Sequence, residues 1–433
     1  MKQSIDVTEF LAAKAEDDCD FRNRLLAKPR ETIEAELGVT LAKDHEIHVH
    51  DESYARTHLV LPPRSKLTKA EKEAAKHGAT SLEFLRKTMH DPAPPARPAE
   101  PGGKPGRKGR PRAGSLARAG RESIRKGLTF LESAIDDNGA WRCIRFNVGD
   151  PGIPRHFERP PFVSALCVLA LESSSEALAQ DICAATRTYL ADTIEFPGLW
   201  RYYQHLPQDL DSTSLCSLVI GSHPWIALGR NTPQILANQD EEGRFMTWVL
   251  ADGEPDVVSR FRIEADPVVN ANVIAYLGEH PATRNAQLWL EALILEGRLE
   301  GSSKWYPDMV SIYYAIARAM NLAPPALERL RPVLADRVLG LRDENGDFGN
   351  VLQTAQAVST LHRIGALDRI DTGRRVEELM DSQHEDGSWP ELLAFGDQTL
   401  KWGVFGQIGH GAESVTAAFC IEALEHLVET MQP

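Results

Sequence analysis

The sequence lacks long apolar runs, paired cysteines and an excess of positive charge. No run approaches the roughly 18 apolar residues that a membrane-spanning helix needs, and the opening MKQSIDVTEF lacks the apolar core of a secretory signal. The formal net charge of -14 argues against general nucleic-acid binding. The six cysteines form no CxxC pair, which argues against a disulfide framework and a zinc site. We therefore expect a cytoplasmic protein that binds no nucleic acid and uses no metal or other cofactor.

The clearest domain boundary is the segment 92–114, in which proline, glycine and basic residues dominate. Such a composition cannot build a core, so we expect a flexible linker between residues 1–91 and residues 115–433. Its lysines and arginines could touch an acidic partner or RNA. For an acidic protein of 433 residues, a solvated linker is the interpretation that we favour.

The segment before the linker carries a recognisable order of elements. Residues 8–37 show helical spacing of apolar side chains, and residues 45–62 alternate like β-strands. FRNRLLAKPRETIEAELGVTL followed by IHVHDESYARTHLVLP resembles the nitrile-hydratase-like leader-peptide family. The resemblance implies that residues 7–63 bind a maturation enzyme of a ribosomal peptide pathway. His48 and His50 share one face of the expected strand, but no further ligand is grouped with them, so we predict solvated histidines there.

After the linker the chain repeats one pattern six times, at a spacing of about fifty residues. Each copy has an apolar helix, an acidic or Asn-Gly turn, an aromatic residue and a second apolar helix. One hairpin cannot bury its apolar face alone, so neighbouring copies must stack. We predict a mainly α fold, an α/α toroid of six helical hairpins, preceded by a small α+β leader-like domain and a disordered linker. A linear solenoid is the alternative.

Two short motifs lie in the sixth and second of these repeats. QHEDGSWPE of the sixth repeat resembles the Gln-Trp motif of squalene–hopene cyclases, which implies structural roles for Gln383 and Trp389. QDLDSTSL resembles the Asp-x-Asp-Asp motif of class II isoprenoid cyclases, with Ser212 in place of the last aspartate. The resemblance spans residues 117–430. It implies a single-domain enzyme that protonates a linear, hydrophobic polyprenyl substrate, with Asp211 as the acid and Asp209 as its hydrogen-bonding neighbour.

The chemistry of the motif fits this role. Two nearby carboxylates cannot both ionise cheaply, which helps to keep a proton on one of them. The N-terminus of a helix favours the anion that is left after proton transfer. The simpler interpretation is that Asp209 or Ser212 only caps the helix. We assign catalytic roles to Asp211, Asp209 and Ser212.

A carbocation needs aromatic faces rather than nucleophiles around it. Of the aromatic residues near the turns and inner helices, we expect four to bind substrate: Trp200, Tyr203, Trp305 and Tyr313. Asn270 lies at the head of another helix, where it binds a substrate head group or braces the ring. His410 lies on a glycine-rich loop, where it deprotonates a terminal cation or is an uncommitted surface histidine. We add Asn270 and His410 to the predicted substrate-binding residues.

Other functions were weighed against this one. No DDxxD-type motif lies on a helix, which argues against ionisation-initiated terpene synthesis. Cys420 and His410 match poorly the zinc ligands of protein prenyltransferases and lanthionine cyclases, two other toroid families. The alternative from a different class is a non-catalytic toroid scaffold, or a leader-tagged cargo of a maturation enzyme. A deep apolar cavity ending at Asp211 favours the cyclase, whereas a polar or filled ring favours the scaffold.

Overall fold

The computed structural model describes residues 11, 14–15, 18–37, 49, 91–92, 113–148, 155–203, 206–221, 231–250, 264–397 and 408–431. Two compact units are present, Met1–Lys66 with Gly253–Pro255, and Leu67–Asp252 with Asp256–Pro433. Most of the linker expected at 92–114 lies outside the described residues. Among the described residues, no helix combines the length and the apolarity that a membrane span requires.

The described part of the first unit is a helical hairpin. It consists of α2 (Cys19–Ala27) and α3 (Pro29–Leu37), and Asp18 caps α2 by accepting the backbone N–H of Phe21 at 2.8 Å. The buried apolar residues are Leu11, Ala15, Phe21, Leu25 and Ile33. The helical prediction is confirmed for these two helices. The strands expected at 45–62 and the histidines among them lie outside the described residues.

The described part of the second unit contains twelve α-helices that form six hairpins. The pairs are α6 (Ala113–Ala134) with α7 (Pro161–Leu171), α8 (Ala177–Asp192) with α9 (Leu210–Ile220), α11 (Asn231–Ala237) with α13 (Pro267–Leu277), α14 (Arg284–Leu295) with α15 (Met309–Leu322), α16 (Arg331–Leu339) with α17 (Val351–Arg363), and α18 (Thr372–Asp381) with α19 (Glu413–Thr430). Three short 3₁₀ helices, Pro281–Thr283, Glu328–Leu330 and Leu367–Arg369, precede α14, α16 and α18.

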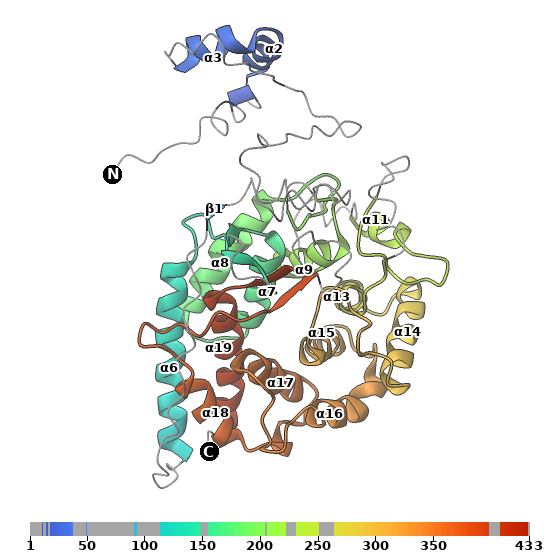
Figure 1. The fold of residues 1–433 in the computed structure, drawn as a ribbon. Helices are drawn as coiled ribbons and strands as arrows, with labels where there is room; N and C mark the ends of the chain where they lie inside the picture. Colours follow the sequence, from blue (N-terminus) through green and yellow to red (C-terminus); the bar gives the residue numbers. More distant parts are fainter. Residues whose placement is uncertain are drawn as a thin grey trace, which may run out of the picture. The chain divides into compact units, whose positions relative to one another are not determined.

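The second helix of each hairpin lies on the inside. Each inner helix packs against the next, and α19 packs against α7, which closes the ring. Figure 1 shows α6, α14, α16 and α18 outside these helices. The closed contact between the first and last hairpins confirms the α/α toroid and excludes the linear solenoid.

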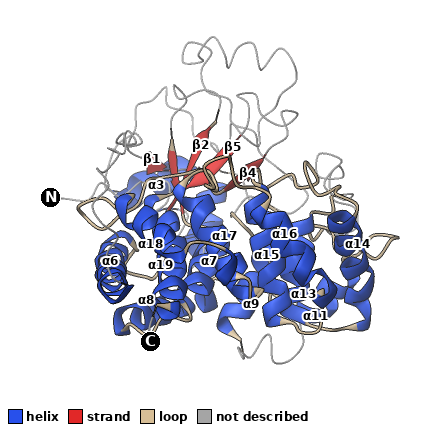
Figure 2. Ribbon diagram, turned by 90° about the horizontal axis from the view of Figure 1, so that it is seen from below, coloured by secondary structure: helices blue, strands red, loops and turns tan. Residues whose placement is uncertain are grey.

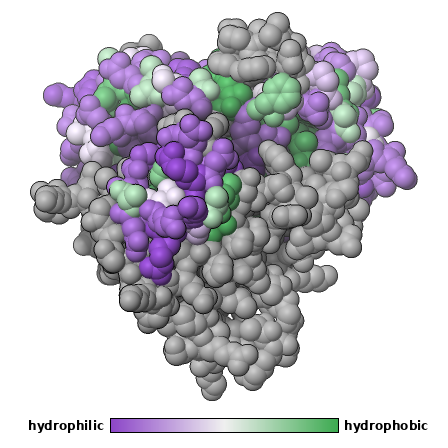
Figure 3. All heavy atoms as spheres, turned by 90° about the horizontal axis from the view of Figure 1, so that it is seen from above, coloured by the Kyte–Doolittle hydropathy of each residue, from purple (hydrophilic) through white to green (hydrophobic). Residues whose placement is uncertain are grey.

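Inner and outer helices differ in how much of their surface is buried. Inner helix α13 is buried at every position from Pro267 to Ala275, whereas outer helix α18 buries one stripe of side chains. A helix that is apolar on all sides belongs inside, and an amphipathic one covers it. On the face of Figure 3, hydrophilic side chains cover most of the described surface, with apolar ones set among them.

The turns are fixed to the inner helices by a repeated hydrogen bond. The backbone N–H of the aromatic residue after each of the first three turns donates to a polar side chain of the inner helix that follows. The pairs are Trp141 with Ser164 at 3.1 Å, Trp200 with Thr213 at 3.0 Å, and Phe245 with Asn270 at 2.9 Å. The repeat therefore has a structural reason to place a small polar residue on each of these inner helices.

The sixth hairpin is held by Gln383 and Trp389. Gln383 donates to the backbone oxygen of Ser123 in α6 at 3.0 Å, and the Ser123 hydroxyl donates back to it at 2.7 Å. The indole of Trp389 donates to the carbonyl of Leu379, near the end of α18, at 2.8 Å. The structural contacts expected of these two residues are present, and those of Gln383 join the last hairpin to the first.

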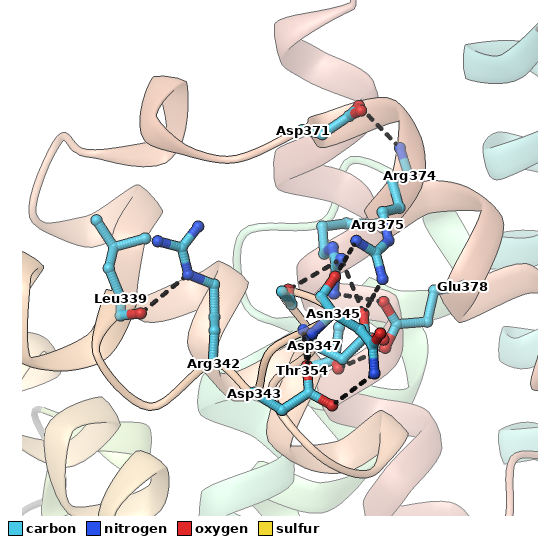
Figure 4. Close-up of polar contacts among 11 residues, drawn as sticks. Leu339, Arg342, Asp343, Asn345, Asp347, Thr354, Asp371, Arg374, Arg375 and Glu378 are labelled. Atoms are coloured by element: carbon cyan, nitrogen blue, oxygen red, sulfur yellow. Dashed lines mark hydrogen bonds and ion pairs between the residues drawn. The ribbon is translucent and has the colours of Figure 1, made fainter.

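The turn of the fifth hairpin is held by ion pairs, where the sixth hairpin is held by the hydrogen bond of an indole. Asp343 accepts the backbone N–H of Asp347 at 2.9 Å, and Arg374 and Arg375 of α18 both bind the Asp347 carboxylate (Figure 4). Arg375 also lies 2.6 Å from Glu378 on its own helix. These ion pairs attach the turn to the outer helix of the next hairpin.

A small antiparallel sheet, which was not predicted, lies at one edge of the helices (Figure 2). Its strands are β1 (Asp91–Pro92), β2 (Cys143–Asn147), β3 (His156–Glu158), β4 (Phe395–Asp397) and β5 (Ile408–Gly411), in the order β1-β3-β2-β5-β4. The segment around His410, predicted as a glycine-rich loop, is therefore a strand. The register sets His410 opposite both Arg145 and Phe395. Residues far apart in the sequence are thus brought to one place.

Candidate active site

A pocket lies beside the first turn of α9, and the space in it that no atom fills, open solvent included, is about 660 Å³. Seven aromatic side chains line it: Phe162, Tyr202, Tyr203, Trp248, Trp305, Tyr306 and Phe395. Its polar lining consists of Arg145, Glu158, Asp209, Asp211, Ser212, Thr247 and His410. The cavity thus combines carboxyl groups with aromatic faces.

Asp209 is the N-cap of α9 and is held by three hydrogen bonds. Its Oδ1 accepts the backbone N–H of Ser212 at 2.6 Å, and its Oδ2 accepts the Ser212 hydroxyl at 2.9 Å and the backbone N–H of Tyr202 at 2.8 Å. Burial, helped by the nearby charge of Asp211, raises the pKa of Asp209 to about 7 against the effect of these donors. The capping role is therefore real for Asp209.

Asp211 lies two residues further along the chain and is held by donors from other elements. Its Oδ1 accepts Nδ2 of Asn272 in α13 at 2.5 Å, and its Oδ2 accepts the Tyr306 hydroxyl at 2.8 Å. Burial raises the pKa of Asp211, whereas these two hydrogen bonds and the positive charge of Arg318 act in the opposite direction. Such a carboxyl keeps its proton more readily than an exposed one. The two hydrogen-bond donors stabilise the carboxylate that forms when the proton is lost. Asp209, expected to hydrogen-bond Asp211, binds Ser212 and Tyr202 instead, and the charge of Asp211 helps to raise the pKa of Asp209.

Arg318 of α15 is a buried cation behind the acid. It is 2% exposed, and its Nη2 donates to Oδ1 of Asn272 at 2.5 Å. Asn272 therefore connects the guanidinium to the Asp211 carboxyl. Arg318 was not among the predicted site residues, although a single charge within the apolar run YYAIARAM is a signal of a buried ion.

The sheet brings a second polar group to the cavity. Arg145 of β2 and His410 of β5 converge on Glu158 of β3, with Arg145 Nε 3.4 Å from Oε1 and His410 Nε2 3.2 Å from Oε2. The Tyr202 hydroxyl donates to the same Oε2 at 3.1 Å. Since the backbone N–H of Tyr202 binds Asp209, this residue joins the sheet group to the acid motif.

Phe395 of β4 connects the two polar groups through aromatic contacts. Its ring centroid lies 6.4 Å from that of Tyr306, which binds Asp211, and 5.3 Å from that of His410. It stacks nearly parallel on His410, with 8° between the planes, and meets Phe162 edge-on at 5.1 Å. Aromatic faces therefore extend from the acid to the histidine.

Six of the nine predicted site residues come together at this cavity: Asp209, Asp211, Ser212, Tyr203, Trp305 and His410. The Trp305 indole donates to Oε1 of Glu264 at 2.7 Å, which leaves its ring against the cavity. His410 is 8% exposed, so the interpretation as a surface histidine is wrong. The strand pairing that buries it gave no local signal in the sequence.

Trp200, Asn270 and Tyr313 do not line the cavity. The Trp200 indole donates to the carbonyl of Leu190 at 3.0 Å, the contact that Trp389 makes in the sixth hairpin. Asn270 binds both the N–H and the carbonyl of Phe245 at 2.9 Å, so it braces a turn. Tyr313 is buried beside the charges of Arg337 and Glu300, and burial raises its pKa. All three serve the packing of the ring.

Several lining residues were missed or lie where the sequence gave little guidance. Phe162, Phe395, Arg145 and Glu158 belong to the sheet or to a helix beside it, and only long-range pairing brings them together. Tyr306 was not selected, and its place just before an inner helix is the signal that could have identified it. Three further aromatic residues, Trp225, Trp402 and Phe405, lie outside the described residues.

Metal-ligating groups were also sought. Among the residues that the structure describes, no cluster of three or more His, Cys, Asp or Glu side chains could hold a metal ion. Cys420, considered as a zinc ligand, is a buried free thiol whose pKa is raised by burial.

Comparisons with known proteins concern the fold. No family model and no curated protein sequence matches the chain. A solved structure of a protein from Actinoplanes aligns with a TM-score of 0.55 at 17% identity, over 71% of this chain and 99% of its own. A variant of the type II terpene cyclase MstE from Scytonema, in complex with its product merosterolic acid A, aligns with a TM-score of 0.54 at 16% identity, over 73% and 99%.

A second MstE variant, in complex with its substrate geranylgeranyl dihydroxybenzoate, aligns with a TM-score of 0.54 at 15% identity, over 73% of this chain and 99% of its own. Identities this low establish shared architecture and leave the chemistry to be argued from the residues. The toroid of this chain has a terpene cyclase-like fold.

Proposed function

We propose that this protein is a single-domain class II isoprenoid cyclase, which starts the cyclisation of a linear polyprenyl substrate by protonation. The observation that carries the proposal is the partly buried Asp211 carboxyl, which lines a cavity together with aromatic rings and is held by Asn272 and Tyr306. The terpene cyclase-like fold supports it, because MstE, which shares that fold, binds geranylgeranyl dihydroxybenzoate.

The reaction is an isomerisation that needs no other reactant. The Asp211 proton adds to one carbon of a terminal alkene, or to the oxygen of an epoxide, and leaves a cation on the more substituted carbon. The π-electrons of the next alkenes close the rings in turn. Aromatic faces stabilise each cation by up to about 2 kcal/mol in a dry site and offer no nucleophile to trap it.

The last step returns a proton to the protein. His410 is the base in this proposal, since it lines the cavity and its Nε2 lies 3.2 Å from Glu158. A carboxylate at this position orients the imidazole and stabilises the imidazolium that forms. The bond electrons of the lost proton become the final alkene, so the product has the composition of the substrate.

The test is incubation with a panel of linear prenyl substrates, namely prenyl alcohols, prenyl diphosphates and prenylated aromatic acids, with product analysis by mass spectrometry. We expect the wild type to form a cyclic isomer of at least one substrate. Asp211→Asn, which keeps the size of the side chain, should form none.

Asp343→Asn is the matched control, because Asp343 is a carboxylate of an exposed turn far along the ring from α9. It should cyclise at the wild-type rate. Turnover by folded Asp211→Asn at the wild-type rate would contradict the role of the acid. A wild type that binds these substrates and converts none would contradict the cyclase.

A further inference from the structure

A network of polar side chains, which are buried or partly buried, crosses five of the six inner helices. Its members are Asp211 in α9, Asn272 in α13, Tyr314 and Arg318 in α15, Arg363 in α17 and Glu422 in α19. Arg318 donates to Asn272, which donates to Asp211. At the other end, Arg363 and the Tyr314 hydroxyl donate to Glu422 at 2.5 and 2.9 Å.

The two halves of this network meet at the Tyr314 ring. The guanidinium carbon of Arg363 lies 4.6 Å from the ring centroid, and that of Arg318 lies 5.5 Å from it. Two guanidinium groups therefore lie at one aromatic ring, and that of Arg363 pairs with the Glu422 carboxylate.

Glu422 is the counter-charge of Arg363. Burial opposes its ionisation, yet the charges of Arg363 and His426 hold the pKa of Glu422 below its usual value. Glu422 is therefore an anion that neutralises one of the two guanidinium groups. The other guanidinium, that of Arg318, needs a different partner.

Arg318 has no carboxylate within 4 Å among the described residues, and its Nε and Nη1 have no hydrogen-bond partner there. A buried charge without a counter-charge is costly. The carboxyl to which its own hydrogen bonds lead, through Asn272, is that of Asp211. An ionised Asp211 would provide the counter-charge of Arg318, whereas a protonated Asp211 leaves the guanidinium charge unbalanced.

We propose that Arg318 is a positioning residue, which fixes the Asn272 amide against Asp211 and supplies the counter-charge for the carboxylate left after Asp211 gives up its proton. The acid role of Asp211 rests on the proposed function. The arrangement of Arg318 and Asn272 rests on the hydrogen bonds alone.

The donor properties of arginine determine how the amide is oriented. A guanidinium only donates, so the Asn272 atom that faces it must be the oxygen, and Nδ2 must then face Asp211. That N–H occupies Oδ1 of Asp211, which favours Oδ2 as the oxygen that carries the acidic proton. The Tyr306 hydroxyl at Oδ2 can rotate to accept this proton's hydrogen bond or to donate to the anion.

Other titratable groups near this pair set the background for a pH experiment. Around Asp211 they are Asp209, Cys216, Asp266 and Tyr306, and around Arg318 they are Asp211, Tyr306, Tyr314 and Arg363. Asp209 and Asp266 titrate with raised pKa values of about 7 and about 6. The signal of Asp211 must therefore be isolated by subtraction.

The experiment measures protonation of Asp211 by infrared difference spectroscopy, with each protein compared against the same protein carrying Asp211→Asn. Arg318→Met removes the charge at similar length. Asn272→Asp keeps the shape but replaces the donor by a carboxylate that would pair with Arg318. We expect the pKa of Asp211 to rise in both variants, because its anion loses stabilisation.

The same variants are assayed for cyclisation over a range of pH. The rate should fall by about tenfold or more, since a weaker acid protonates an alkene more slowly, and the alkaline limb of the pH profile should move to higher pH. Arg337→Met, at an outer helix, is the control and should change neither measurement. If Arg318 had only a structural role, Arg318→Met would lower the cyclisation rate without moving the alkaline limb of the pH profile.

The outcomes separate the two proposals. An Asp211 titration that does not move in either variant overturns the role of Arg318, even if the wild type is a cyclase. A titration that moves as expected in a protein that cyclises no substrate leaves Arg318 as the counter-charge of Asp211 and removes the cyclase. If Arg318→Met does not fold, Asn272→Asp gives the same decision.

Discussion

At the scale of single residues, two aspartates of one motif have different tasks because different donors hold them. Asp209 accepts hydrogen bonds from its own helix and the preceding segment, which fixes it as a cap. Asp211 accepts them from α13, the neighbouring inner helix, and from Tyr306, which precedes α15. The first aspartate secures the helix, and the second is placed where a substrate can reach it.

The raised pKa of Asp209 predicts a pH-dependent stability. Its folded pKa of about 7 exceeds its usual value of 3.8, so the folded state binds more protons between these pH values. The contribution of Asp209 to stability is therefore fully present below pH 4 and is lost as pH rises to 7, with a slope of at most about 1.4 kcal/mol per pH unit. Asp209→Asn, which still caps the helix, should lack this slope.

Urea unfolding of both proteins at several pH values measures the difference. The gap between the two free energies of unfolding should narrow or reverse in favour of Asp209→Asn as pH rises from 4 to 7. A constant gap would show that Asp209 titrates normally in the folded protein.

Sequence reasoning located the acid motif at this scale but not the residues that tune it. Asp211 stands in a pattern of neighbouring residues, whereas its partners Asn272, Tyr306 and Arg318 come from other repeats. A lone charge in an apolar helix is visible in the sequence. Which carboxyl it serves depends on how the helices pack.

At the scale of elements, the repeat explains why one expected residue, Trp200, is not at the cavity. Trp200 and Trp389 each donate their indole N–H to the carbonyl ten residues before them, at 3.0 and 2.8 Å. Both carbonyls belong to the last turns of outer helices, where intrahelical partners run out. Position in the repeat, rather than closeness to the acid motif, determines the role of these tryptophans.

Trp200→Phe should therefore lower stability more than activity. It leaves a buried carbonyl without its donor, which costs about 1–3 kcal/mol, measurable by urea unfolding. The cyclisation rate below the unfolding temperature should remain close to that of the wild type.

Trp305→Phe is the matched comparison, since Trp305 lines the cavity. It should lower the cyclisation rate more than the stability. The prediction is wrong if the two variants show the opposite ranking.

The helices were predictable because their signals are local, and the sheet was not. Apolar periodicity and turn residues recur within each fifty-residue copy. By contrast, Ile144 of β2 pairs with Gly411 of β5, a contact between opposite ends of the toroid sequence, and strands of five and four residues show no clear alternation. Apart from His410, the cavity residues that lie on the sheet were missed for this reason.

At the scale of the whole molecule, the chain divides into units with cores of their own. The hairpin of α2 and α3 buries its own apolar cluster, and the cavity residues all belong to the second unit. The binding of a maturation enzyme by residues 7–63 remains a proposal from the leader-like resemblance. It requires nothing from the toroid.

A chain that starts at Leu67 should therefore fold and keep the proposed cyclase activity. We expect its thermal unfolding and its cyclisation rate to match those of the full chain, because β1 and the whole ring are retained. Calorimetry and the substrate panel check this. Loss of turnover in a folded truncated chain would mean that the first unit contributes to the reaction.

The contact of α19 with α6 and α7 makes the order of the hairpins cyclic. An open array of repeats frays from its two terminal copies, which need polar caps. In this ring every inner helix has a neighbour on both sides, so no copy is terminal and none is expendable. A permuted chain that begins with α8 and ends with α7 would give each helix the same neighbours as before.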